Sequence, residues 1–191
     1  MTARDAEQVI ARELEPGERL LWSGVPKQGL LLRGSDAFVI PFSLLWGGFA
    51  IFWEGSVLQS GAPFFFALWG IPFVLVGLYL IVGRFFVDAS QRAGTAYGFT
   101  DKRVVISSGV FSRTVKSLSL RTVSDMTVTE RRDRSGTIAL GPTPPWGQWY
   151  AGAAWPGLAA QRGPAFELIE DAKSVYTQLL SAQSAAQRVA G

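Results

Sequence analysis

The residues most able to do chemistry in this chain are cations gathered around one turn. Residues 100–109 read TDKRVVISSG, so Lys102 and Arg103 stand at a turn directly before a β-branched run. Three further cations follow in the next stretch: Arg113, Lys116 and Arg121. Lys and Arg side chains bind phosphates and carboxylates. The stretch is therefore either a loop that grips phosphate or the corner of a β-hairpin, in which Asp101 would supply the turn-forming hydrogen bonds.

The composition excludes several kinds of catalysis. The sequence has no Cys and no His, so it cannot form a disulfide, a thiolate or imidazole zinc site, or a Ser-His-Asp or Cys-His catalytic group. No P-loop, G-x-S-x-G or H-E-x-x-H pattern and no paired-carboxylate signature is present. We therefore expect a non-catalytic protein with no catalytic residue, no metal ligand and no cofactor.

Two long uncharged runs predict a transmembrane hairpin that would hold these cations near a membrane. Residues 37–53 form a run of 17 uncharged residues, and residues 62–83 form a run of 22. The second run, as a helix, is about 33 Å long and can cross a hydrocarbon core of about 30 Å. We expect spans at about 37–57 and 62–83. A buried hairpin of a soluble protein is the alternative, but such helices rarely lack a polar face for six turns.

The charges that flank the hairpin predict its orientation. The connecting segment, EGSVLQSGAP, has no Lys or Arg, whereas Lys27 and Arg33 precede the hairpin and Arg84 and Arg92 follow it. The positive-inside rule then places both termini in the cytoplasm. We expect a multi-pass protein of the bacterial inner membrane, with Trp53 at the outer interface.

Small residues within the hairpin indicate close helix packing. The candidate packing residues are four glycines: Gly47, Gly48, Gly70 and Gly77. They allow two backbones to approach closely, and intramolecular packing of the two helices is the favoured interpretation. Self-association or docking to another membrane protein remains an alternative. Pro41 and Pro72 are expected to kink the helices.

The periodicity after the hairpin changes to that of strands. Short alternating or β-branched segments, separated by turn residues, predict an antiparallel meander. The segments lie at 97–99, 104–106, 118–120, 126–129 and 137–140. A helix is expected from about Ile169, with Ala172, Val175, Tyr176, Leu179 and Leu180 on one face. At the N-terminus, Ala6–Leu14 predicts a helix, and Glu18–Ser23 predicts a strand that could join the same sheet.

These residues resemble a known family. The stretch YGFTDKRVVISSGVFSRTVKSLSLRTVSDMTV, at 97–128, is similar to bacterial pleckstrin-homology-like (PH-like) domains of membrane-anchored proteins. LLWSGVPKQGLLL at 20–32 and FELIEDAKSVYTQLL at 166–180 fit the same architecture. The resemblance implies a curved, partly closed β-sheet capped by a C-terminal helix, and it carries no catalytic motif. The expected fold class is α+β: a two-helix transmembrane hairpin plus a small PH-like antiparallel sheet or barrel.

The expected domain order follows from these segments. Residues 1–36 form a cytoplasmic helix and strand, 37–83 the hairpin, 84–183 the PH-like domain, and 184–191 a flexible tail. One segment departs from the family pattern: residues 142–164 are rich in Pro and carry Trp146, Trp149, Tyr150 and Trp155. These rings either pack on the sheet, lie in the bilayer interface, or bind a partner.

The charge distribution leaves two hypotheses for function. Residues 84–134 carry ten Lys or Arg against five acids, whereas residues 1–36 carry five against six. Anionic lipid attracts such cations, and nothing resembles a nucleic-acid-binding motif, so we expect the bilayer and no nucleic acid. The favoured hypothesis is a membrane-tethered binding module for a protein partner or anionic lipid headgroups, with Lys102, Arg103, Arg113, Lys116 and Arg121 as binding candidates. The alternative is a structural or accessory subunit of a larger membrane complex.

Overall fold

The structure is a computed structural model that describes residues 1–32, 36–109, 113–142 and 163–188. It contains two compact units, and each is described by itself. The first unit, called the module below, is built from the described residues of 1–29 and 89–188. The second is built from Leu30–Asp88. The four aromatic residues Trp146, Trp149, Tyr150 and Trp155 lie outside the described residues, so their predicted roles stay predictions.

The second unit contains the two helices that the uncharged runs predicted. Helix α2 spans Asp36–Gln59 and α3 spans Phe64–Leu78, and both are continuous through their prolines. A π-helical turn, η1, at Tyr79–Gly83 joins α3 to α4 at Arg84–Ala93. The helix therefore runs ten residues past the expected end of the second span. Both helices are long and apolar enough to cross a membrane.

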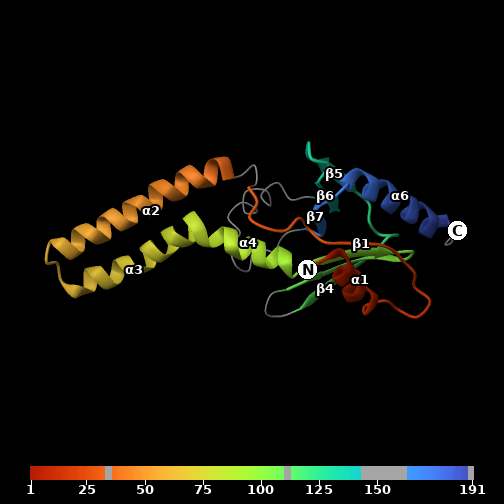
Figure 1. The fold of residues 1–191 in the computed structure, drawn as a ribbon, viewed down its shortest axis with the longest axis horizontal. Coiled ribbons are helices and arrows are strands. Elements are labelled where there is room, and N and C mark those ends of the chain that lie inside the picture. The colour runs from red at the N-terminus through yellow and green to blue at the C-terminus, as the bar shows by residue number, and fades with distance from the viewer. Residues whose placement is uncertain (33–35, 110–112, 143–162, 189–191) are drawn as a thin grey trace. The chain divides into compact units, whose positions relative to one another are not determined.

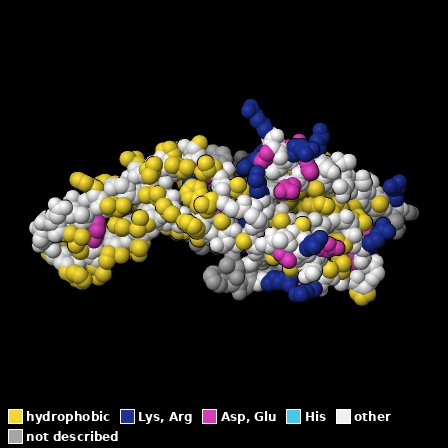
Figure 2. Space-filling model, viewed as in Figure 1, with side chains coloured by type: hydrophobic (Ala, Val, Ile, Leu, Met, Phe, Trp, Pro, Cys, Tyr) yellow, Lys and Arg dark blue, Asp and Glu magenta, His cyan; other side chains and the backbone are white. Residues whose placement is uncertain are grey.

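The surface of this hairpin is the reverse of a soluble protein's surface. Large apolar side chains are exposed along both helices, including Leu45 at 75%, Phe52 at 73% and Phe64 at 79% (Figure 2). The small residues are buried instead: Ser43, Gly47, Ala50, Gly70 and Gly77. Apolar patches of this extent on a folded protein mark a surface that meets lipid or protein.

The module contains two antiparallel sheets (Figure 1). The first sheet has the order β1-β2-β3-β4 and the second has the order β5-β6-β7. The strands are β1 Leu20–Gly24, β2 Ala96–Thr100, β3 Arg103–Ser108, β4 Thr114–Ser119, β5 Met126–Glu130, β6 Gly136–Leu140 and β7 Ala165–Ile169. The predicted meander is confirmed, and so is the pairing of the N-terminal strand with it, because β1 pairs with β2.

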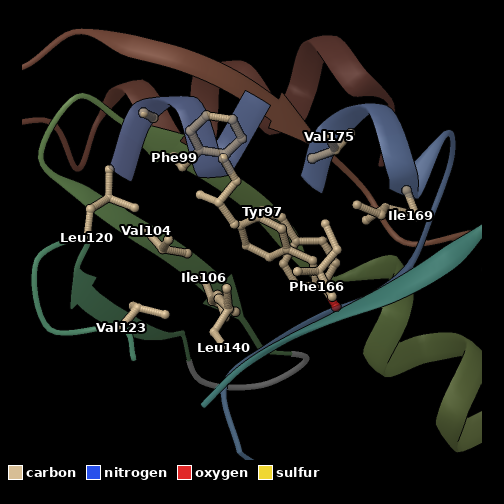
Figure 3. Close-up of a cluster of buried hydrophobic side chains, with 14 of the residues drawn as sticks. Tyr97, Phe99, Val104, Ile106, Leu120, Val123, Leu140, Phe166, Ile169 and Val175 are labelled. Atoms are coloured by element: carbon tan, nitrogen blue, oxygen red, sulfur yellow. The ribbon is translucent and has the colours of Figure 1, made fainter. Parts of the chain in front are cut away.

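One hydrophobic core lies between the sheets and the C-terminal helix α6, Ala172–Arg188 (Figure 3). Phe166 from β7 is fully buried, with its ring centroid 5.1 Å from that of Tyr97 and 5.4 Å from that of Trp22. Val104 of β3 and Leu120, directly after β4, contribute to this core, and Val175 contributes from α6 (Figure 3). These apolar residues alternate along the strands, and for that reason the sequence pattern located them.

The ends of the helices differ from the sequence predictions. Ile169 belongs to β7 and not to the C-terminal helix, and Leu180 is exposed. The helix does not end near Gln183, because Ala186 is buried against the core and the helix continues to Arg188. The N-terminal helix α1 spans Ala3–Ala11, earlier than expected, and begins with a capping box between Thr2 and Asp5.

Candidate functional site

The turn at Thr100 is held by a hydroxyl group, not by the carboxylate that the sequence suggested. Thr100 Oγ1 accepts hydrogen bonds from the backbone N–H groups of Lys102, at 3.1 Å, and Arg103, at 3.0 Å. Asp101 instead ties this turn to the start of β1, since its carboxylate accepts from the N–H of Arg19 at 3.0 Å. The prediction of a hairpin corner is right, but the residue that closes the corner is Thr100.

Arg103 is occupied by an internal carboxylate. Its Nε and Nη2 atoms each donate to the Glu18 carboxylate at 2.9 Å, and Nη2 also donates to the Glu13 carbonyl at 2.8 Å. The Glu18 side chain is fully buried. Burial raises the pKa of Glu18, but hydrogen bonds from Arg103, the Glu15 N–H and Thr100 outweigh it and lower the pKa to about 2. A bidentate pair of this kind leaves little of the guanidinium for phosphate.

Arg113 is held by the same N-terminal segment. Its Nη2 donates to the Val9 carbonyl at 3.1 Å and lies 3.0 Å from the Glu13 carboxylate. Between Arg103 and Arg113, Ile10 of α1 packs on Val105 of β3. The two arginines therefore clamp α1 and the chain after it onto the outer face of the first sheet. Both guanidinium groups therefore serve the fold and are not part of the basic surface described below.

The remaining candidates are placed differently from one another. Lys102 and Arg121 are exposed and adjacent, because the N–H of Leu120 donates to the carbonyl of Lys102 at 3.0 Å. Lys116 is half-buried and lies opposite Ile106 in the register of β3 and β4, away from that pair. Sequence reasoning missed Arg19, which Asp101 brings to the same corner. Only the β1–β2 pairing could have placed Arg19 there.

Arg19, Lys102 and Arg121 are called the basic corner below. All three are exposed, and within the described residues their side chains make no hydrogen bond or ion pair. A few cations without partners on a folded surface attract a negatively charged ligand. The same described residues contain no group of three or more acids that could hold a metal ion.

The strand register places the basic corner at one end of the first sheet. Leu20 pairs with Thr100, and at the opposite end Gly24 pairs with Tyr97. The chain leaves the sheet for the hairpin after Gly24 and returns to it at Ala96. Both connections to the hairpin thus belong to the end opposite the basic corner. This end is called the tether end below.

The two connections are joined to each other at the tether end. Arg92, buried near the end of α4, donates to the carbonyls of Lys27 and Gly29, the latter at 2.7 Å. The Gln28 side chain donates to the Arg92 carbonyl at 3.3 Å. The sequence signal for α4 was available in the polar residues Arg84, Asp88 and Arg92, which recur every four residues and are all buried.

The hairpin's predicted packing residues fall into two groups. A Cβ on Gly77 would lie 2.8 Å from the Gly47 Cα, so these two glycines face each other. A Cβ on Gly70 would meet Trp53 at 2.6 Å and also the Glu54 carboxylate. Gly48, in contrast, has nothing within 4 Å of its Cβ position among the described atoms.

The base of the hairpin is closed by a buried ion pair that sequence reasoning missed. Arg84 Nη1 lies 2.5 Å from the Asp36 carboxylate, and both side chains are almost fully buried. Arg84 also lies over the Phe85 ring, 4.3 Å from its centroid. The available signal was one acid directly before the first span and one arginine directly after the second.

Comparison with models of known protein families shows which family this chain is related to. The model for the bacterial PH domain matches residues 40–183, which includes the hairpin, the strands β2 to β7 and most of α6. The chain belongs to the bacterial PH domain family. No curated protein and no solved structure matches it. In this bacterial PH domain the apolar hairpin is inserted between the paired strands β1 and β2, and α1 and β1 precede the matched residues.

Proposed function

We propose that this chain is a non-catalytic integral membrane protein whose bacterial PH domain binds an acidic protein partner at the cytoplasmic face of a bacterial inner membrane. The hairpin crosses the bilayer, and both termini are cytoplasmic. The observation that carries the proposal is the basic corner: Arg19, Lys102 and Arg121 are exposed and unpartnered within the described chain, at the end opposite the hairpin connections.

The position of the basic corner favours a protein over a lipid headgroup there. Strands β1 and β2 have five residues each, so the corner lies about 17 Å along the sheet from the tether end. A soluble acidic surface can reach this end of the module from the cytoplasm.

The membrane part of the proposal is tested by labelling introduced cysteines. The natural sequence has no Cys, so Gln59→Cys places a unique thiol at the last residue of α2, before the connection to α3. We expect a membrane-impermeant maleimide to label it from outside intact spheroplasts. Ser174→Cys, exposed on α6, is the matched control and should be labelled only after lysis. Labelling of Ser174→Cys in intact spheroplasts would contradict the orientation.

The binding part is tested by crosslinking followed by purification in a mild detergent. We expect one stoichiometric partner with the wild type and at least a tenfold loss of it with Lys102→Glu/Arg121→Glu, because two favourable contacts become repulsive. Thr127→Glu/Thr177→Glu is the control, since it adds two negative charges at exposed positions outside the corner. Equal loss in both variants would overturn the role of the basic corner.

A structural or accessory subunit of a larger membrane complex is the second candidate function, and Gly48 favours it. This glycine lies on the exposed side of α2, where a partner helix could approach its backbone. If Gly48→Leu releases the crosslinked partner and the Lys102→Glu/Arg121→Glu variant keeps it, the hairpin and not the basic corner carries the interaction.

A further inference from the structure

A second group of arginines lies on the module in the turn between β5 and β6. The turn is well defined: the N–H of Arg131 donates to the Ser135 carbonyl at 2.8 Å, and the Asp133 carboxylate accepts from the Ser135 hydroxyl at 2.7 Å. Arg131 and Arg132 are exposed at its apex. These two residues are called the arginine tip, and none of the sequence patterns above singled them out.

The arginine tip belongs to the tether end of the module. Lys27, which follows β1 on the way to the hairpin, donates its backbone N–H to the Leu168 carbonyl at 2.8 Å. Its ammonium group lies 2.7 Å from the Asp133 carboxylate within the turn. The carbonyl of Lys27 accepts from Arg92 near the end of α4. The turn is therefore attached to both connections that lead to the hairpin.

The connection between the apolar span and this end of the module is short along the chain. Helix α4 has ten residues and directly follows Gly83, the last residue of the uncharged run. Helix α4 ends at Ala93, directly after Arg92, which donates to the carbonyl of Lys27. The basic corner is at the other end of strands β1 and β2.

The charges around the turn leave the arginine tip available. Asp133 is paired with Lys27, and Asp171 lies 3.4 Å from Arg134, so two of the nearby acids are already neutralised. Hydrogen bonds from Lys27 and Ser135 keep the pKa of Asp133 well below its usual range. Arg131 and Arg132 make no side-chain hydrogen bond or ion pair with any described residue. Glu130, at the start of the turn, also makes no side-chain hydrogen bond or ion pair with a described residue, so Arg131, Arg132 and Glu130 together leave one net positive charge.

We propose that the arginine tip, Arg131 and Arg132, contacts the anionic phospholipid headgroups of the bilayer that the hairpin crosses. This proposal rests on the membrane insertion proposed above. Juxtamembrane cations gain about 1 kcal/mol each from an anionic leaflet, and that attraction needs no pocket. Two exposed arginines fit this kind of contact better than the capture of one free phosphate, which needs several converging donors.

The contact between tip and headgroups is measured with a reporter on the full-length protein in vesicles. Thr129→Cys places a unique thiol on an exposed position of β5 beside the turn. A fluorophore on it should be quenched by headgroup spin-labelled lipid in vesicles that contain phosphatidylglycerol. It should be quenched much less in pure phosphatidylcholine. High salt should reverse the quenching. Equal quenching in both lipids would overturn the proposal.

Substitutions test whether the arginine tip, and not the other exposed cations of the module, makes the contact with the headgroups. Arg131→Ala/Arg132→Ala should lower the docked-to-free ratio about fivefold per arginine, and Arg131→Lys/Arg132→Lys should retain most of it, because the charge is kept. Lys102→Ala/Arg121→Ala is the matched control and should leave the quenching unchanged. If the control loses as much quenching as the tip variant, the contact is not specific to the tip.

Further measurements distinguish the headgroup contact from a site for free phosphate, from a protein contact and from a failure of membrane insertion. If inorganic phosphate displaces the tip more than chloride at equal ionic strength, the ligand is free phosphate and the lipid proposal is wrong. If Arg131→Ala/Arg132→Ala removes the crosslinked protein partner, the tip is a protein contact. Failure of Gln59→Cys to label from outside would remove the membrane insertion itself. Labelling of Gln59→Cys with an unresponsive Thr129 reporter would overturn only the headgroup contact.

Discussion

The hairpin and the module use the same kinds of residue in opposite ways. In the module, large apolar side chains such as Phe99 and Phe166 are buried, and most exposed positions are polar. In the hairpin, Leu45, Phe52 and Phe64 are exposed, and glycines form the contact between the helices. The hydrophobic effect in water explains the first arrangement. The second is the arrangement expected where lipid is the solvent and close packing of small residues joins the helices.

The two regions also treat charge differently. The module holds its buried carboxylate, Glu18, with Arg103 and Thr100, and carries surface cations that make no ion pair with any described residue. The hairpin unit contains a buried ion pair at its base, between Asp36 and Arg84. Charge in the module can therefore bind a partner, whereas the ion pair in the hairpin unit closes the helices together.

The largest expected effect tests whether apolar side chains stabilise the module by burial while those of the hairpin do not. Phe166→Ala should destabilise the module by about 3–5 kcal/mol, because it empties a fully buried site between Tyr97 and Trp22. Leu45→Ala, at a hairpin position that is 75% exposed, should leave the unfolding of the module unchanged. Thermal unfolding of the full-length protein in detergent, followed by near-UV circular dichroism, measures both. Equal losses would mean that the hairpin residue also packs in a protein core.

The next effect tests the buried carboxylate of the module. Glu18 has a pKa of about 2 in the folded protein and an ordinary value of 4.5. Its contribution to the free energy of unfolding is therefore complete above about pH 4.5 and is lost as the pH falls toward 2. Glu18→Gln should lower the stability at pH 7 by on the order of 3 kcal/mol. It should also flatten the loss of stability in this acidic window.

Asp133 provides the check on that interpretation. Its pKa is also held low, by Lys27 and Ser135, so the Glu18→Gln variant should keep part of the acid dependence. Denaturant unfolding at a series of pH values from 6 to about 2.5 gives the slope for each variant. An unchanged slope in Glu18→Gln would show that Glu18 does not carry the acid sensitivity.

The sequence located what depends on local pattern. Uncharged runs located the spans, and alternation located the strands, because burial on one face of a strand repeats every two residues. The family resemblance gave the β-module, and the family match over 40–183 confirms it. The predicted end of the C-terminal helix was wrong. Burial of Ala186 against the core stabilises the last turns of this helix, and the Ala/Ser/Gln composition does not show such a tertiary contact.

The candidate site was harder to predict because it depends on pairings far apart in the chain. Glu18 and Arg103 are 85 residues apart, and Lys27 and Asp133 are 106 apart. No periodicity connects such positions, so Arg103 was expected to be free and is instead held internally. Likewise, the positions of Lys102 and Arg131 at opposite ends of the module follow from strand register and from Lys27, not from their local sequence.

The smallest of the three effects tests the close packing of the hairpin. Gly77→Leu should destabilise the association of α2 and α3 by about 1–3 kcal/mol, because its Cβ would lie 2.8 Å from the Gly47 Cα and backbone cannot move aside as a side chain can. Gly48→Leu is the matched control, since nothing lies within 4 Å of its Cβ position. Disulfide crosslinking between cysteines introduced at Ser43 and Ile81 would measure the approach of the helices in membranes. Because Ile81 and Gly77 both face α2 near Gly47, separation of the helices should reduce crosslinking in Gly77→Leu alone. Equal crosslinking in both variants would mean that the two helices are held by the exposed apolar side chains, and the contrast between hairpin and module would then lose its basis in glycine packing.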